Sequence, residues 1–156
     1  MHASSMTLMA DFRDRYLSGM QGCSILDVGA RMSKKQSCSY RDLLGDYAYT
    51  AMDIEPGPNV DIVGYERLGV YDVVISGQVM EHVLRPWDWL KNLVQYYRAY
   101  ICIIAPNKWK EHRYPIDTYR YFPDGMRDLF DYAGIVPVEV RRFGVNTIGI
   151  GTHASN

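Results

Sequence analysis

The sequence predicts an α/β fold in which a mostly parallel sheet is flanked by helices and ends in an antiparallel hairpin. Short apolar runs alternate with helical patterns or loops along most of the chain, as is typical of a parallel sheet. The last two runs are separated by only three residues, so they predict a hairpin. Two early runs end in an acid, Asp27 and Asp53, which places carboxylates where parallel strands end.

The first half of the chain predicts a helix followed by strands that alternate with short helical or loop segments. Apolar residues recur at helical spacing over residues 6–20, and Ser18 and Gly19 supply a stop. The expected elements that follow are a buried strand at residues 23–28 with a turn at Gly29, a short helix at 40–44 stopped by Gly45, a strand at 48–53, and a loop forced by the Pro-Gly-Pro of 56–58.

The second half continues the alternation and then breaks it. A proline at position 86 predicts a helix start, because its missing N–H costs nothing in the first turn. The expected elements are strands at residues 60–63 and 71–76, a helix from 86 to about 97, a strand at 100–105, a loop at 107–122, a helix at 123–133 closed by Gly134, and hairpin strands at 136–143 and 147–153 joined by 144–146.

Length and composition predict one soluble domain. A chain of 156 residues supports a single core, so we expect one domain over residues 1–156, with an N-terminal helix in 1–20 and the core in 22–156. A net charge of −1 argues against nucleic acid as a partner. No apolar run approaches the ~18 residues of a membrane span, no signal peptide is recognisable, and the three cysteines lack a CxxC spacing. We therefore expect a cytoplasmic protein without membrane contact.

The two aspartates predict a bound nucleoside. A carboxylate such as Asp53 at the end of a second strand can accept hydrogen bonds from both hydroxyls of a ribose. Asp27 precedes Gly29 where a dinucleotide site would receive phosphate, and a carboxylate there favours a cationic, amino-acid-bearing ligand such as S-adenosylmethionine. The alternatives are a turn residue at Asp27 and an Asx turn at Asp53.

Several motifs together resemble the class I S-adenosylmethionine-dependent methyltransferases, particularly the small type 11 group. They are residues 25–29 (Ile-Leu-Asp-Val-Gly), Asp53, residues 71–83 (Tyr-Asp-Val-Val-Ile-Ser-Gly-Gln-Val-Met-Glu-His-Val) and the terminal hairpin. The resemblance implies a Rossmann-like, seven-stranded sheet with the seventh strand antiparallel between the fifth and sixth. It also implies S-adenosylmethionine as cofactor. The expected cofactor contacts are Asp27, Gly29, Asp53, Ile54, Ser76 and Gln78.

The chain also departs from the family pattern. The family usually continues its first motif with two more glycines, where this chain has Arg31 and Ser33. The acid that usually contacts adenine would fall near Tyr65, with Glu66 and Asp61 as possible substitutes. These departures keep open a second hypothesis, a methyltransferase-like binding or regulatory protein without catalysis. A nicotinamide-dependent oxidoreductase is disfavoured, because the segment after Asp27 lacks a phosphate-binding glycine turn.

The acceptor side of the site is expected in the loop of residues 107–122. Residues 39–43, 52–61 and 112–126 resemble a bacterial subgroup associated with glycan or specialised-metabolite pathways. We expect a small-molecule acceptor methylated on oxygen or nitrogen. The candidates for binding it are Tyr114, Asp117 and Arg120, although Asp117 and Arg120 can instead form an ion pair that fixes the loop.

Two histidines are candidates for a catalytic base. An imidazole with a pKa near ~6.5 can deprotonate a hydroxyl acceptor, which is the role considered for His82 and His112. The alternative for His82 is a structural hydrogen bond. We expect no metal site, because the four histidines are scattered in the sequence and match no ligand spacing. The expected oligomeric state is a monomer or homodimer.

Overall fold

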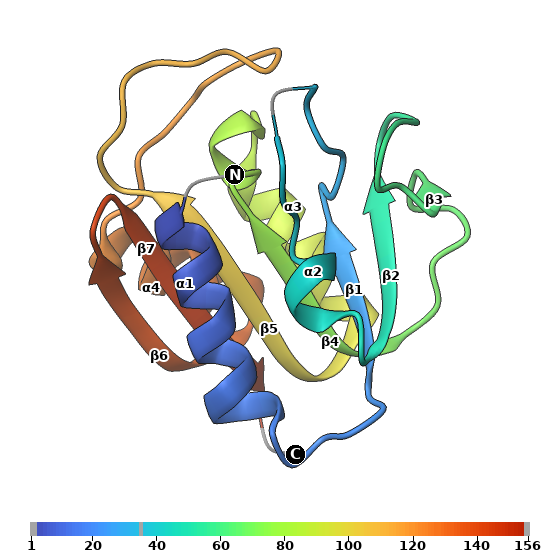
Figure 1. Cartoon of the computed structure of the whole chain (residues 1–156). Helices are drawn as coiled ribbons and strands as arrows, with labels where there is room; N and C mark the ends of the chain where they lie inside the picture. The colour runs from blue at the N-terminus through green and yellow to red at the C-terminus, as the bar shows by residue number, and fades with distance from the viewer. Residues whose placement is uncertain (1–2, 35, 155–156) are drawn as a thin grey trace.

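A computed structural model describes residues 3–34 and 36–154 and contains one seven-stranded sheet with helices on both faces (Figure 1). The strand order is β3-β2-β1-β4-β5-β7-β6. Strands β1 to β5 pair in parallel, whereas β7 is antiparallel to both β5 and β6. The predicted fold class is therefore confirmed, including the seventh strand between the fifth and sixth. Residues 1–2 of the predicted N-terminal helix lie outside the described residues.

The elements follow the predicted order closely. The strands are β1 (Ser24–Val28), β2 (Ala48–Asp53), β3 (Ile62–Val63), β4 (Tyr71–Gly77), β5 (Tyr97–Pro106), β6 (Ile135–Phe143) and β7 (Asn146–His153). The helices are α1 (Ala3–Phe12), α2 (Arg41–Leu44), α3 (Pro86–Leu93) and α4 (Pro123–Ala133), with single-turn segments η1 (Arg13–Leu17), η2 (Met80–His82) and η3 (Val94–Tyr96). Among the described residues, no helix combines the length and apolarity needed to cross a membrane.

The sheet separates two hydrophobic clusters. On the face covered by α1 and α2, Phe12 and Leu44 pack with strand residues such as Ile75 (Figure 1). On the face covered by α3 and α4, Leu90 and Phe130 pack with the opposite side chains of the same strands. Because strands in the centre of such a sheet are buried on both faces, they read as continuous apolar runs in the sequence.

The predicted C-terminal end of α3 is wrong. The helix from Pro86 ends at Leu93, a short 3₁₀ turn follows, and Tyr97 already belongs to β5. The Tyr97 ring is buried and stacks on His153 of β7 with ring centroids 4.2 Å apart, and Tyr97 pairs with Tyr71 of β4. Strand pairing thus outweighs the helical spacing of the local sequence, which continued to this tyrosine.

Candidate functional site

The predicted cofactor residues lie at the carboxyl ends of three neighbouring strands. The chain runs outward from β1 to β2 and β3 and then returns to add β4 on the other side of β1. Ligands of open α/β sheets bind beside such a reversal of strand order. Asp27 near the end of β1 aligns with Ala51 of β2 and Ile75 of β4, so Asp53 and Ser76 end at the same edge.

Asp53 accepts two backbone hydrogen bonds at this edge. Its Oδ2 accepts from the Arg31 N–H at 3.1 Å, and its Oδ1 accepts from the Glu55 N–H at 3.2 Å. The second bond is the Asx turn considered from the sequence. A carboxylate has about four acceptor positions, so both oxygens keep acceptor capacity for a ligand. The predicted ribose role and the turn are therefore compatible.

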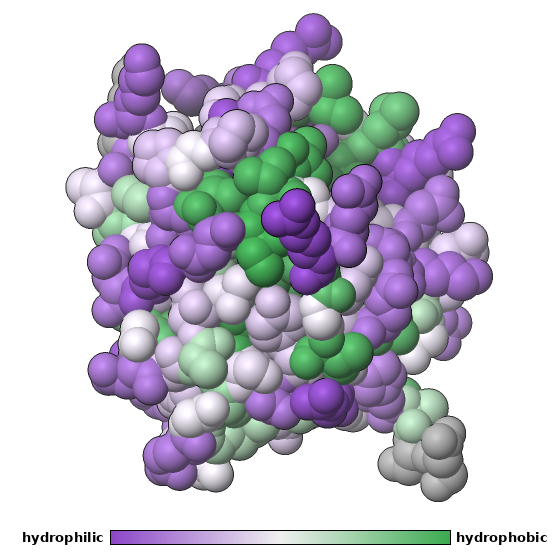
Figure 2. All heavy atoms as spheres, turned by 90° about the vertical axis from the view of Figure 1, so that its right-hand side faces the viewer, coloured by the Kyte–Doolittle hydropathy of each residue, from purple (hydrophilic) through white to green (hydrophobic). Residues whose placement is uncertain are grey.

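Ile54, directly after Asp53, presents an apolar side chain to solvent. It is 70% exposed, and Val63 of the adjacent β3 is 50% exposed. Figure 2 views the molecule from the side of β2 and β3 and shows hydrophobic atoms gathered within a polar surround. An exposed apolar surface beside Asp53, the carboxylate predicted to bind ribose, suits the flat face of a nucleobase.

Asp27 is buried, in contrast to the accessible Asp53. It is 3% exposed and accepts a hydrogen bond from the Tyr49 hydroxyl. Burial raises the pKa of Asp27 to about 7. Gly29 follows in the left-handed conformation with φ of 82°, and a Cβ there would lie 2.3 Å from Val79. Gly29 is therefore needed both for its backbone angle and for this close packing.

The end of β4 carries two further predicted cofactor residues. The Ser76 hydroxyl is buried and donates to the Val28 carbonyl at 2.7 Å, which joins the ends of β4 and β1. Gln78 has a φ of 62°, an unusual angle for a residue other than glycine. Its Nε2 donates to Asn146 at 3.0 Å, whereas its buried Oε1 has no hydrogen-bond partner among the described residues. Such strain concentrates at ligand sites.

Arg31 links the end of β2, which carries Asp53, to the loop at 107–122. Its guanidinium forms an ion pair with Glu55 at 2.7 Å and donates to the Tyr114 hydroxyl at 2.8 Å. The same group lies 5.4 Å from the centre of the Tyr114 ring. A glycine at this position, as in the family pattern, could make none of these contacts. The sequence showed that Arg31 stands where the family pattern has glycine, but it did not predict these contacts. We call the contacts of Arg31 with Glu55 and Tyr114 the clasp.

Asp117 and Arg120 form an ion pair with each other within the loop. Arg120 donates to both oxygens of Asp117, at 2.6 and 2.7 Å, and to the carbonyls of Trp109, Lys110 and Tyr119. These bonds use all N–H donors of a guanidinium. The hydrogen bond from Arg120 also holds the pKa of Asp117 well below its usual range. Of the two sequence interpretations, the structure favours the local ion pair.

The structure brings His82 and His112 together beside a buried acid. Their ring centroids are 4.8 Å apart, and Glu81 Oε1 lies 3.7 Å from His82 Nε2 and 3.9 Å from His112 Nε2. These two histidines are distant in the sequence but adjacent in the fold. His153 lies apart, bonded to Tyr97, and His2 is outside the described residues. Sequence reasoning gave Glu81 no role, although its adjacency to His82 was the available signal.

Burial shapes the protonation of this cluster. It lowers the pKa of His82, whose Nδ1 is hydrogen bonded to the Ile116 carbonyl at 2.6 Å. It raises the pKa of Glu81 to about 7, because a carboxylate loses its hydration in the interior. The histidine therefore has the structural contact that the sequence left as one alternative, and it faces Glu81 with its other nitrogen.

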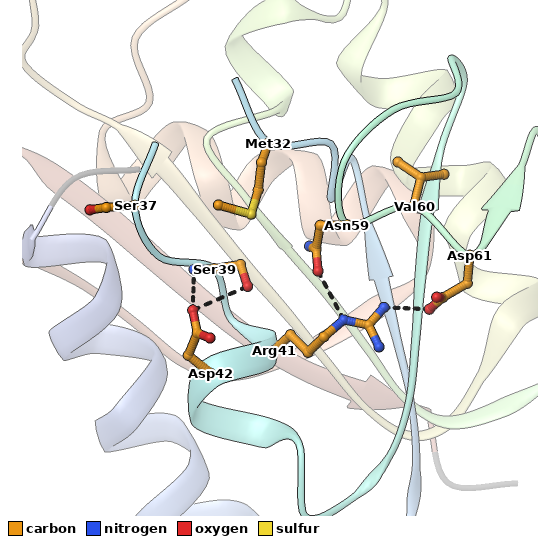
Figure 3. Close-up of a pocket in the computed structure, with 8 residues that line it drawn as sticks. All are labelled: Met32, Ser37, Ser39, Arg41, Asp42, Asn59, Val60 and Asp61. Carbon is orange, nitrogen blue, oxygen red and sulfur yellow. Dashed lines mark hydrogen bonds and ion pairs between the residues drawn. The ribbon is translucent and has the colours of Figure 1, made fainter. Parts of the chain in front are cut away.

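A separate open groove of about 480 Å³ lies beside α2 (Figure 3). Arg41 crosses it and donates to Asn59 at 2.8 Å and to Asp61 at 2.5 Å. Asp61 also accepts a hydrogen bond from the Ala51 N–H, which ties its side chain to β2. Both acids considered for adenine are exposed, but Asp61 is hydrogen bonded to Arg41 and Ala51, whereas Glu66 forms no side-chain hydrogen bond among the described residues. The groove is lined by Met32, Ser37, Ser39, Arg41, Asp42, Asn59, Val60 and Asp61.

Comparison with solved structures identifies the fold. No family model and no curated protein matches the sequence. A SAM-dependent methyltransferase from Aquifex aeolicus superimposes with a TM-score of 0.65 at 16% identity, covering 97% of this chain and 98% of that one. The fold is that of the class I methyltransferases.

Two further structures with the same fold were determined with S-adenosylhomocysteine (SAH). Magnesium protoporphyrin IX methyltransferase (ChlM) from Synechocystis PCC 6803 with bound SAH has a TM-score of 0.69 at 14% identity, over 96% of this chain and 83% of that one. The N-terminal domain of EvdMO1, in the presence of SAH and D-fucose, has a TM-score of 0.63 at 15% identity, over 98% and 84%. At these identities the likeness establishes the fold alone.

Proposed function

We propose that this protein transfers the methyl group of S-adenosylmethionine to an oxygen or nitrogen of a small acceptor. The observation that carries the proposal is Asp53, a carboxylate with free acceptor capacity at the reversal of strand order, followed by the 70% exposed Ile54. Asp53 receives the ribose hydroxyls, and the adenine covers Ile54. The solved methyltransferases with SAH support the choice of cofactor.

The methionine part of the cofactor belongs at the ends of β1 and β4 in this proposal. Gly29 lets the backbone turn beneath it, and Asp27 orients a water or backbone group near the cationic amino group. Ser76 holds the two strand ends together through the Val28 carbonyl. The Oε1 of Gln78 has no hydrogen-bond partner in the described part of the chain, so it is available as an acceptor at the same edge.

The acceptor lies on the side of the 107–122 loop. Tyr114 is 51% exposed and contacts it, whereas Asp117 and Arg120 hold the loop in shape. The acceptor oxygen or nitrogen attacks the methyl carbon as the bond from carbon to sulfur breaks, which yields S-adenosylhomocysteine. Its proton passes to His112, the more exposed of the two histidines, with His82 as the second candidate base. The resemblance to glycan and specialised-metabolite enzymes makes polyhydroxylated acceptors the first class to test.

Calorimetry with S-adenosylhomocysteine tests the cofactor assignment. Asp53→Ala removes two hydrogen bonds to an ionised acceptor, each worth about 1.5 to 3 kcal/mol, so affinity should fall on the order of 100-fold or more. Asp46→Ala is the matched control, because it removes an exposed acid near the opposite end of the same strand. Absence of binding by the unmodified protein at millimolar ligand, or equal affinity of Asp53→Ala, would overturn the proposal.

The second candidate function is a binding or regulatory protein that has the fold without catalysis. The clasp of Arg31, Glu55 and Tyr114 favours it, because a charged side chain stands where the family has glycine. Arg31→Gly discriminates between the two. If the clasp closes the cofactor site, this variant gains affinity for S-adenosylhomocysteine. If Arg31 belongs to a working site, the variant loses affinity.

A further inference from the structure

The cluster formed by Glu81, His82 and His112 has the composition of a metal site. Glu81 and His82 lie in η2 directly after β4, and His112 comes from the loop at 107–122. One ligand atom from each residue lies within 4.8 Å of the other two. The topology thus joins two segments that are distant in sequence around three donor atoms of the types that transition metals prefer.

Glu81 is a buried acid whose carboxylate accepts no hydrogen bond from the described residues. Its side chain is 0% exposed, and neither carboxylate oxygen has a hydrogen-bond partner among the described residues. Two histidine nitrogens face Oε1, the Nε2 of His82 at 3.7 Å and the Nε2 of His112 at 3.9 Å. Burial of an unpaired carboxylate costs several kcal/mol, and such groups are usually paired or coordinate a metal. A cation between Glu81 and the histidines would remove this cost.

Both histidines are oriented as metal ligands are. The Nδ1 of His82 contacts the Ile116 carbonyl at 2.6 Å. The Nδ1 of His112 lies 3.3 Å from the Lys110 carbonyl and 3.4 Å from the Asp117 carboxylate. Metal-binding histidines commonly donate the second ring N–H to a carbonyl or carboxylate, which directs the free nitrogen at the metal. Here each Nε2 is directed toward Glu81.

The outer residues of the cluster are rigid. Asp117 is 1% exposed and is held by both nitrogens of the Arg120 fork. The backbone around Glu81 is held as well, because the Thr118 N–H and hydroxyl donate to the Glu81 carbonyl at 2.7 and 2.8 Å. The hydrogen bonds of Arg120 fix Asp117, and Asp117 in turn contacts His112. They therefore set the position of the His112 ring.

We propose that Glu81, His82 and His112 bind a divalent transition metal ion, with zinc as the reference ion. Tetrahedral zinc with bonds of about 2.0 to 2.1 Å places ligand atoms about 3.3 Å apart. Metal binding therefore shortens the separations of 3.7 and 3.9 Å from Glu81 by about half an ångström, and it brings the two histidine nitrogens together from a separation within 4.8 Å. His112 is 33% exposed and His82 13%, so the remaining coordination position faces solvent on the acceptor side.

Three protein ligands and one open position are the arrangement of catalytic rather than structural zinc. The open position takes water or an oxygen of a hydroxylated ligand. The metal assignment does not depend on the cofactor assignment, because it rests on residues that the cofactor assignment does not use. It replaces the base role proposed for His82 and His112, because an Nε2 bound to a metal cannot accept a proton.

Calorimetric titration of the chelator-treated, full-length protein with zinc chloride tests the site without any cofactor. We expect one zinc per chain, a rise in melting temperature on zinc addition, and an intense visible spectrum of tetrahedral type when cobalt(II) replaces zinc. His112→Asn and Glu81→Gln should each weaken zinc affinity by about tenfold or more. His153→Gln and Cys38→Ser should bind as the unmodified protein does, since neither belongs to the cluster.

The outcomes separate the alternatives. His112 lies on a partly exposed loop, so His112→Asn remains informative if Glu81→Gln does not fold. Unchanged stoichiometry and affinity in His112→Asn would overturn the proposal, as would absence of saturable zinc binding. In the latter case a protonated Glu81 that donates to a histidine is the remaining explanation of the cluster. Zinc binding with no cofactor binding would leave the metal site standing and remove the methyltransferase.

Discussion

Asp27 makes the stability of this protein fall as pH rises. Burial raises the pKa of Asp27 from 3.8 to about 7, so the folded state retains a proton that the unfolded state has already lost. The contribution is fully favourable only below the unfolded pKa, and it is lost as pH rises toward the folded pKa. The shift corresponds to about 4 kcal/mol, of which about 3 kcal/mol develops between about pH 5 and about pH 8.

Asp27→Asn removes this titration and keeps an oxygen that accepts from Tyr49. The free energy of unfolding of this variant can be measured by urea denaturation at several pH values. It should not show the decrease with rising pH that the titration of Asp27 causes in the unmodified protein. The difference between variant and unmodified protein should therefore shift in favour of the variant by about 3 kcal/mol from about pH 5 to about pH 8. If the buried amide of the Asp27→Asn variant lowers the free energy of unfolding by the same amount at every pH, that amount does not affect this shift. The exposed Asp46→Asn is the control and should follow the unmodified protein. A difference between Asp27→Asn and the unmodified protein that does not vary with pH would refute the reasoning.

Two further predictions concern packing and the acceptor loop. Gly77→Ala should destabilise the fold by about 3 kcal/mol in thermal or urea unfolding, because the new Cβ would lie 2.6 Å from Cζ of the fully buried Tyr40. Gly19→Ala, with nothing within 4 Å, is its control, and equal stabilities would contradict the prediction. Arg120→Lys should speed amide hydrogen exchange across residues 107–122, since an ammonium cannot replace a five-donor fork. The exposed Arg127→Lys should leave exchange unchanged, and protection that survives in Arg120→Lys would show that the loop is held by other contacts.

Local signals predicted most of the fold but not its boundaries. The signals that predicted the elements are local: apolar runs of strand length, the proline at 86 and Gly134. Each acts through its own backbone or its immediate neighbours, so it can be recognised from a single sequence. The start of β5 at Tyr97 was missed because its cause is a partner strand and the ring of His153. Strand pairing is a property of distant residues, which helical spacing cannot report.

The candidate site was predictable only where it depends on strand ends. Asp53 and Ser76 reach the same edge because parallel strands end together. The loop at 107–122 has no period, and its hydrogen bonds connect residues in an order that the chain does not display. Arg120 therefore looked like a ligand group, although the folded loop uses all its donors.

The sequence by itself determined the order of strands and helices, the terminal hairpin and the acids at the ends of β1 and β2. These depend on apolar spacing, turn residues and the direction of the chain, all of which are local. Only the tertiary structure decided which polar groups meet: Arg31 with Tyr114, Asp27 with Tyr49, and Glu81 with the two histidines. The physical reason is that burial and hydrogen-bond partners come from segments far apart in sequence. The same residue type is therefore a ligand group or a structural anchor according to what the fold places beside it.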